Sequence, residues 1–126
     1  MSFLLDAHTL IWFAEGSGRL SSKARSELLT ENNKYISIAC LWEITIKAGK
    51  NKLELKQSLR ELNRFLVLNY IQIMDIKISH LNTLLELPHH HSDPFDRLLI
   101  AQAITENLTI ISADRHFAAY PVEVIW

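Results

Sequence analysis

Short apolar runs alternate along this chain with segments whose apolar residues recur every three or four positions. The apolar, β-branched runs indicate buried strands, and they occupy 2–6, 34–38, 70–76, 108–112 and 122–126. The amphipathic segments between them predict helices over 7–18, 20–33, 39–50, 58–69, 77–87 and 93–107, with a short helical turn at 113–120. We expect strands and helices to alternate along the whole chain.

Helix boundaries are marked by capping residues. Gly16 and Gly18 end the first helix in a turn, Ser22 is a plausible N-cap of the second, and Asp93 followed by Pro94 starts the last long helix. Alternating strands and helices favour crossover connections, so the predicted fold class is α/β, with a central parallel sheet and helices on both faces. Ligands of such sheets bind beyond the carboxyl ends of the strands, where the strand order reverses.

Composition narrows the class of protein. The 126 residues are 48% apolar and 21% charged, which suits one globular domain spanning 1–126. The net charge of -1 provides no general attraction to nucleic acid or to anionic membrane. Asp6 and His8 interrupt the apolar run near the start, which argues against a signal peptide or membrane span. The one cysteine, Cys40, cannot form an internal disulfide, so we expect a reducing, cytoplasmic setting.

Four acidic residues stand where chemistry is expected. Asp6 directly follows the first strand and Asp114 comes shortly after the fourth, so both lie at the same rim of the sheet. Glu43 lies among apolar residues and needs a partner, because a buried unpaired carboxylate is costly. Asp96 lies in the first turn of the last long helix. Each acid also has a structural interpretation, as a helix cap for Asp96 and Asp114, a strand end for Asp6 and an ion pair for Glu43.

The joint placement of these acids is more informative than any one of them. Carboxylates that crowd together raise one another's pKa unless a cation compensates their charge. Oxygen ligands select hard ions such as Mg²⁺ or Mn²⁺. A site of this kind suits phosphodiester hydrolysis, in which the metal activates a water molecule and stabilises charge on the phosphoryl oxygens.

Histidines offer a competing metal site. Three of them are consecutive in "LPHHHSDPFDRLLIAQA", but neighbouring loop residues point in different directions and cannot easily share one ion. We therefore expect His89 and His90 to be solvated, while His91, closest to the helix start, is a candidate for substrate contact. His8 and His116 flank rim acids, and packing or surface roles are expected for both.

Four segments together resemble the PIN-domain proteins, in the subgroup that contains VapC-type toxins. They are "LLDAHTLIWF", "SIACLWEITIKAGKNKLEL", "LPHHHSDPFDRLLIAQA" and "TIISADRHFAAYPVEVIW", and they cover nearly the whole chain. The resemblance implies a PIN-like (Rossmann-like) three-layer sandwich and a metal-dependent endoribonuclease that uses Mg²⁺ or Mn²⁺. It also implies the toxin of a type II toxin-antitoxin pair, acting as a homodimer on RNA, silenced by a small cognate antitoxin and without a membrane role.

Residue by residue, the resemblance implies that Asp6, Glu43, Asp96 and Asp114 are the catalytic and metal-binding acids. Ser112 stands where such proteins often carry a hydroxyl, and Arg97 in "DPFDR" is a candidate phosphate contact that could equally pair with an acid. Ala7 replaces the threonine that often follows the first aspartate, and Thr9 lies two places further on. Ser112, Arg97, His91 and Thr9 are the expected substrate-binding residues.

Two other classes remain open. One is a catalytically silent PIN-like module that only binds a partner, and the other is a receiver-type signalling domain, which also carries acids at the rim of a parallel sheet. The basic run with Lys47, Lys50, Lys52 and Lys56 is the best local candidate for contacts to a nucleic-acid backbone, with a solvated loop as the alternative.

Overall fold

A five-stranded parallel sheet with the order β3-β2-β1-β4-β5 forms the centre of the computed structural model, which describes residues 1–126. Its strands are β1 (Ser2–Leu5), β2 (Asn33–Ser37), β3 (Ile71–Met74), β4 (Thr109–Ile111) and β5 (Val124–Ile125). The helices are α1 (Ala7–Glu15), α2 (Ser22–Leu28), α3 (Ile38–Gly49), α4 (Leu59–Leu68), α5 (Ile78–Glu86), α6 (Pro94–Glu106) and the 3-10 helix η1 (Arg115–Ala119). The predicted α/β class and the alternation of elements are confirmed.

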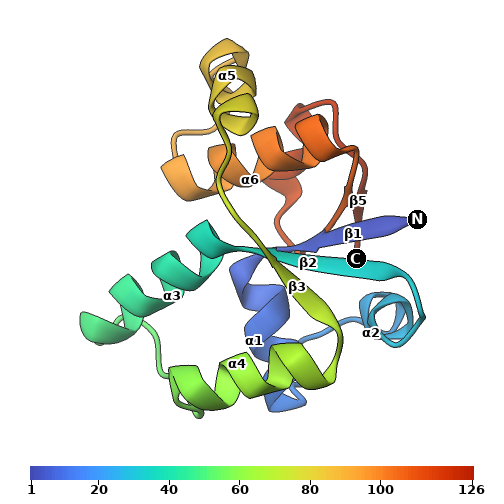
Figure 1. The fold of residues 1–126 in the computed structure, drawn as a ribbon, viewed down its shortest axis with the longest axis vertical. Coiled ribbons are helices and arrows are strands. Elements are labelled where there is room, and N and C mark those ends of the chain that lie inside the picture. Colours follow the sequence, from blue (N-terminus) through green and yellow to red (C-terminus); the bar gives the residue numbers. More distant parts are fainter.

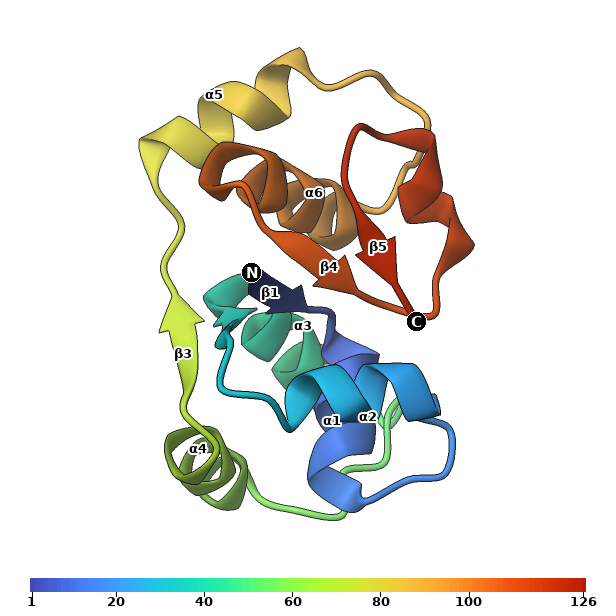
Figure 2. The same cartoon turned by 90° about the vertical axis from the view of Figure 1, so that its right-hand side faces the viewer.

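Helices cover both faces of the sheet (Figure 1). The turned view shows α5 and α6 on one side and α1, α2 and α4 on the other (Figure 2). Helix α3 continues directly from β2 and packs against both α1 and α6. The three layers of the predicted sandwich are therefore present, and α3 lies at the carboxyl ends of the central strands.

The central strands are apolar on both faces, as expected for strands covered by helices on both sides. Phe3, Leu4 and Leu5 of β1 and Ile110 and Ile111 of β4 are fully buried. These strands supply the middle of the core. The polar side chains of this region, such as Asp6 and Ser112, come directly after the strands.

The strand order reverses between β1 and β4. The chain first adds β2 and β3 on one side of β1 and later places β4 and β5 on the other. The backbone N–H of Asp6 donates to the carbonyl of Ile111 at 3.3 Å, so the two strand ends stay together. This order differs from the 2-1-3-4-5 order of receiver domains, and the receiver alternative is therefore wrong.

Caps agree with the sequence in most places. Asp93 caps α6, with Oδ1 accepting from the Asp96 N–H at 3.0 Å and Pro94 in the first turn. The N-cap of the second helix is one residue earlier than predicted, because Ser21 rather than Ser22 accepts the hydrogen bond from the Ala24 N–H. No helix combines the length and apolar character needed to cross a membrane.

Candidate metal centre

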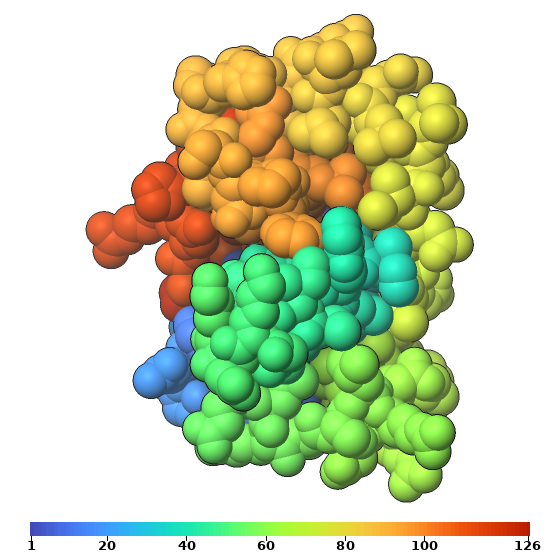
Figure 3. Space-filling view, turned by 90° about the vertical axis from the view of Figure 1, so that its left-hand side faces the viewer, coloured from blue at the N-terminus to red at the C-terminus, as the bar shows by residue number.

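A cleft of about 290 Å³ opens at the point where the strand order reverses. The space-filling view of this side shows blue N-terminal residues between green α3, the orange start of α6 and the red C-terminal segment (Figure 3). All four predicted acids line the cleft, and they arrive from four separate parts of the chain: Asp6, Glu43, Asp96 and Asp114. Ala7, His8, Trp12, Lys47, Asp93 and Ala113 complete the lining.

Asp6 stands between β1 and α1 and is held at both of its oxygens. Its Oδ1 accepts the Thr9 N–H at 2.8 Å, which makes Asp6 the N-cap of α1. Its Oδ2 accepts from the hydroxyl of Ser112, which follows β4. The expectation that Asp6 merely ends a strand is incomplete, because the same carboxylate starts a helix and links two strand ends.

Asp96 is the acid most strongly affected by its surroundings. Burial, followed by the negative charges of Asp93 and Glu43, raises the pKa of Asp96 from 3.8 to about 6. Its Oδ2 lies 2.9 Å from Nε2 of His91. Asp96 therefore does not complete a reciprocal capping box with Asp93, and its carboxyl group faces the cleft.

Glu43 is buried on α3, as its apolar neighbours predicted, and its carboxylate pairs with the ammonium group of Lys47. Nζ of Lys47 lies 2.8 Å from Glu43 Oε2, one helical turn away. This hydrogen bond raises the pKa of Lys47, so the ammonium group stays protonated. Lys47, considered from the sequence for nucleic-acid contacts, thus lines the cleft as the partner of Glu43.

Asp114 follows β4 through Ser112 and Ala113. Its N–H donates to Ser112 Oγ at 3.0 Å, so Ser112 connects Asp6 with Asp114. Asp114 Oδ1 caps η1 by accepting the His116 N–H at 2.9 Å, and Nδ1 of His116 lies 2.8 Å from the same oxygen. Partial burial acts to raise the pKa of Asp114, but the hydrogen bonds from His116 outweigh it, and the pKa falls below 3.8.

The chemistry of this donor set fits a hard divalent cation. Four carboxylates line the cleft, and carboxylate oxygens are the ligand type that Mg²⁺ and Mn²⁺ prefer. Their negative charge extends beyond the cleft: burial, followed by Asp6 and Glu43, raises the pKa of the Cys40 thiol well above 9.0. Burial is the main cause of the raised pKa of Asp96, and the negative charges of Asp93 and Glu43 add to it, so the carboxylates of the cleft lie close enough to interact.

The structure places two of the predicted substrate-binding residues elsewhere. Thr9 is fully buried, and its hydroxyl donates to the Ile111 carbonyl at 2.9 Å. Arg97 is buried on α6, where its guanidinium donates to the Pro88 carbonyl at 2.8 Å and to the Tyr120 hydroxyl at 3.3 Å. Neither side chain lines the cleft, so we correct both expectations: Thr9 joins α1 to β4, and Arg97 braces the loop before α6.

The other two residues remain close to the acids. Ser112 is buried between Asp6 and Asp114, and His91 is half-buried beside Asp96. The His91 N–H donates to the Tyr120 hydroxyl at 2.9 Å, which fixes the loop that carries it. Both residues therefore position acids directly.

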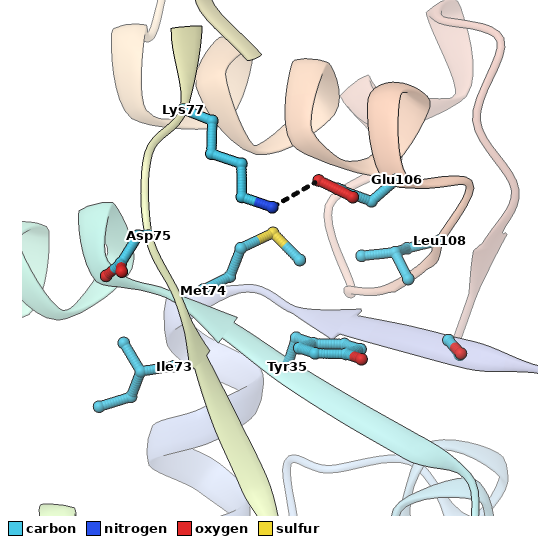
Figure 4. A pocket seen from close by; sticks show the side chains of 8 residues that line it. Tyr35, Ile73, Met74, Asp75, Lys77, Glu106 and Leu108 are labelled. Carbon is cyan, nitrogen blue, oxygen red and sulfur yellow. Dashed lines mark ion pairs between the residues drawn. The ribbon is translucent and has the colours of Figure 1, made fainter. Parts of the chain in front are cut away.

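A second hollow, of about 380 Å³, lies on another part of the molecule (Figure 4). Lys77 and Glu106 face each other across it, with Nζ 3.7 Å from Oε2, and Nε2 of the buried His80 lies 2.9 Å from the same oxygen. Two acidic residues, Asp75 and Glu106, line this hollow, and Glu106 is paired with Lys77 and His80. This hollow lacks the excess negative charge of the cleft and is not the candidate metal centre.

Three further residues, two in the cleft and one beside it, were not assigned to the site from the sequence. Asp93 was recognised only as a cap, although its charge also reaches Asp96. The pairing of Glu43 with Lys47 could have been found from their spacing of four residues on one helix. The only sign in the sequence of the contact between His116 and Asp114 was that the two residues lie two positions apart, which is weak evidence.

The fold and site define a class of α/β protein with acids gathered at the switch point of a parallel sheet. Residues 3–123 match the profile of the PIN domain, and the chain belongs to the PIN-domain family. A comparison with curated proteins found no significant match.

Solved structures with similar folds include three complexes. A chain of VapBC2 from Rickettsia felis, crystallised with a DNA fragment from their promoter, is 20% identical with a TM-score of 0.77, over 99% of this chain and 98% of that one. A chain of a toxin-antitoxin complex from Klebsiella pneumoniae is 21% identical with a TM-score of 0.66, over 98% and 95%. One of VapBC-1 from nontypeable Haemophilus influenzae is 14% identical with a TM-score of 0.67, over 99% and 97%. These likenesses show the same fold across the full length of each chain.

Proposed function

We propose that this protein is a metal-dependent endoribonuclease that acts as a VapC-type toxin. The observation that carries the proposal is the convergence of Asp6, Glu43, Asp96 and Asp114 on one cleft in a PIN-domain fold. These acids would be the catalytic and metal-binding residues. A divalent cation, Mg²⁺ or Mn²⁺, would activate a water molecule for attack on phosphorus and stabilise the charge on the phosphoryl oxygens.

The residues of the chain itself hold the cleft ready. Asp6 is fixed by the Thr9 N–H and the Ser112 hydroxyl, so its carboxylate loses little freedom when it binds a cation. Asp96 Oδ2 lies 2.9 Å from Nε2 of His91, and this contact orients the Asp96 carboxyl group. Lys47 pairs with the buried Glu43 and holds its carboxylate in place. Fixed ligands of this kind lower the reorganisation needed at the moment of reaction.

The partner half of the proposal rests on the similar structures. Chains with this fold occur in VapBC2, in VapBC-1 and in a toxin-antitoxin complex, and each is covered almost completely by this chain. We infer that a small antitoxin binds this protein and blocks the cleft, and that the active form is a homodimer. Co-expression with the adjacent reading frame tests the partner. If only this chain carries an affinity tag, a small untagged protein should co-purify with it in a fixed ratio.

Cleavage of single-stranded RNA by the purified chain tests the activity. Wild type should cut with Mg²⁺ or Mn²⁺ and stop when a chelator is added, and Asp6→Asn should be inactive because its carboxylate is central to the donor set. Asp75→Asn is the matched control, since Asp75 is exposed and lies outside the cleft. Cleavage retained by Asp6→Asn, or lost equally in Asp75→Asn, would contradict the assignment.

A further inference from the structure

Two histidines from distant parts of the chain meet beside the acidic cleft. His91 lies in the loop before α6 and His116 lies in η1, and their ring centroids are 5.1 Å apart at an angle of 38°. One potential ligand atom from each of His91, Asp114 and His116 lies within 4.8 Å of the other two. No other three acids, histidines or cysteines in the chain come this close together.

Each of the two histidines contacts a carboxylate, one inside the group and one outside it, and a metal ion can replace such contacts. Nδ1 of His116 lies 2.8 Å from Asp114 Oδ1, and Nε2 of His91 lies 2.9 Å from Asp96 Oδ2. In each contact a ring nitrogen and a carboxylate oxygen already face each other, so a divalent cation bound to either atom could take the place of the hydrogen bond.

The donor set differs in kind from the cleft. Two imidazole nitrogens and one carboxylate oxygen form a typical three-ligand set for Zn²⁺, with water as the fourth ligand. Imidazole favours Zn²⁺ and other transition metals, whereas Mg²⁺ favours oxygen ligands alone. The four acids of the cleft and this group therefore suit different ions, although Asp114 belongs to both.

Supporting contacts hold two of the three ligands in place. The Tyr120 hydroxyl accepts the His91 N–H at 2.9 Å, and Tyr120 is itself buried. The Ser112 hydroxyl accepts the Asp114 N–H at 3.0 Å. His116 is the exposed member, with 74% of its side chain accessible, so an ion can reach the group from solvent and the ring can turn to meet it.

We propose that His91, Asp114 and His116 form a transition-metal site, for a cation of the Zn²⁺ or Co²⁺ class, at the edge of the acidic cleft. The site stands on its own ligands and does not depend on RNA cleavage. It adds to the expectation that His91 contacts substrate and that His116 has a packing or surface role: His91 would share an ion with a distant histidine rather than with its neighbours in the triplet.

Metal binding to the full chain tests the site directly. Zn²⁺ affinity is measured by calorimetry, and the absorbance of bound Co²⁺ reports nitrogen ligation. His116→Ala should weaken Zn²⁺ binding by about 100-fold or more, since loss even of a supporting residue around a metal typically costs about 10–100-fold. Because His116 is exposed, this variant should fold normally, and circular dichroism checks that it does. His91→Gln should show the same loss.

Two controls separate this site from its alternatives. His89→Ala removes an exposed member of the triplet and should bind Zn²⁺ like wild type. Asp6→Asn removes a cleft acid and should also keep Zn²⁺ affinity, even where RNA cleavage is lost, so failure of the two proposals can be told apart. Unchanged Zn²⁺ affinity in His116→Ala, or an equal loss in His89→Ala, would overturn the site.

Discussion

Replacing Asp96 with asparagine should stabilise the metal-free protein at neutral pH. The Asp96 side chain is 24% exposed, and its pKa rises from 3.8 to about 6 on folding, so keeping it ionised opposes the folded state. At about 1.4 kcal/mol for each pH unit, this difference sets a ceiling of roughly 3 kcal/mol. Loss of the hydrogen bond with His91 offsets roughly 1 kcal/mol of that. We expect Asp96→Asn to raise the free energy of unfolding by about 1–2 kcal/mol.

The pH dependence follows from the sign of this shift. Because the folded carboxyl binds its proton more tightly than the unfolded one, the penalty is absent below about pH 4 and grows as pH rises through about 6. The ionisation penalty of about 3 kcal/mol at pH 7.5 falls to about 1 kcal/mol at pH 4.5, so the advantage of Asp96→Asn should nearly vanish at pH 4.5 once the lost His91 contact is subtracted. Saturating Mg²⁺ should favour wild type instead, since a ligand that binds only the folded state adds about 2.7 kcal/mol at a hundred times its Kd.

Urea denaturation of wild type, Asp96→Asn and the control Asp75→Asn measures these differences. The reasoning is refuted if Asp96→Asn is no more stable than wild type at pH 7.5 in a chelator, or if its advantage does not depend on pH. An equal gain in Asp75→Asn would show that the effect comes from overall charge rather than from crowding in the cleft.

Three further substitutions test other parts of the structure. Lys47→Met leaves Glu43 buried without its partner, so it should cost about 1–3 kcal/mol in metal-free urea denaturation, with part of the loss recovered in Mg²⁺. Arg97→Met removes a buried guanidinium that holds loop carbonyls and should cost about 2–4 kcal/mol, with faster proteolysis between 84 and 92. Glu106→Gln should be less stable at pH 7; because the hydrogen bond from His80 lowers the pKa of Glu106 below 4.5, the gap should close as pH falls through that lowered pKa.

Exposed residues of the same types serve as controls for these three. The control for Lys47→Met is Lys50→Met, the control for Arg97→Met is Arg60→Met, and the control for Glu106→Gln is Glu54→Gln. All three control residues are exposed. A control that loses as much stability as its test variant would remove the structural explanation offered for that variant. The pH series for Glu106→Gln fails if the gap widens in acid.

Most of the fold could be predicted because local patterns carried it. The buried strands are continuous apolar runs, and capping residues such as Asp93 and Gly16 mark where helices begin and end. The strand order could not be read from these patterns, because pairing between β1 and β4 joins residues about a hundred positions apart. Boundaries moved by a residue where two capping residues stand side by side, as at Ser21.

The four acids could be placed in one cleft for a simple reason. Asp6 and Asp114 follow parallel strands, whose carboxyl ends share one rim, Asp96 lies in the first turn of α6, and Glu43 lies in the middle of α3, which starts at the same edge. The sequence could not show whether the side chains of Thr9 and Arg97 face the cleft or the backbone carbonyls that they bind, since their positions in the sequence suit either direction. Nor could it show that His91 meets His116, because that contact depends on the packing of η1 against the loop before α6.

The chemical nature of the RNA ends tests the central claim most directly. A water molecule activated in the cleft of Asp6, Glu43, Asp96 and Asp114 would attack phosphorus without help from the 2′-hydroxyl, so wild type with Mg²⁺ should leave 5′-phosphate and 3′-hydroxyl ends, and Asp96→Asn should leave no product. Fragments ending in 2′,3′-cyclic phosphate, or product from Asp96→Asn at wild-type rates, would contradict the account.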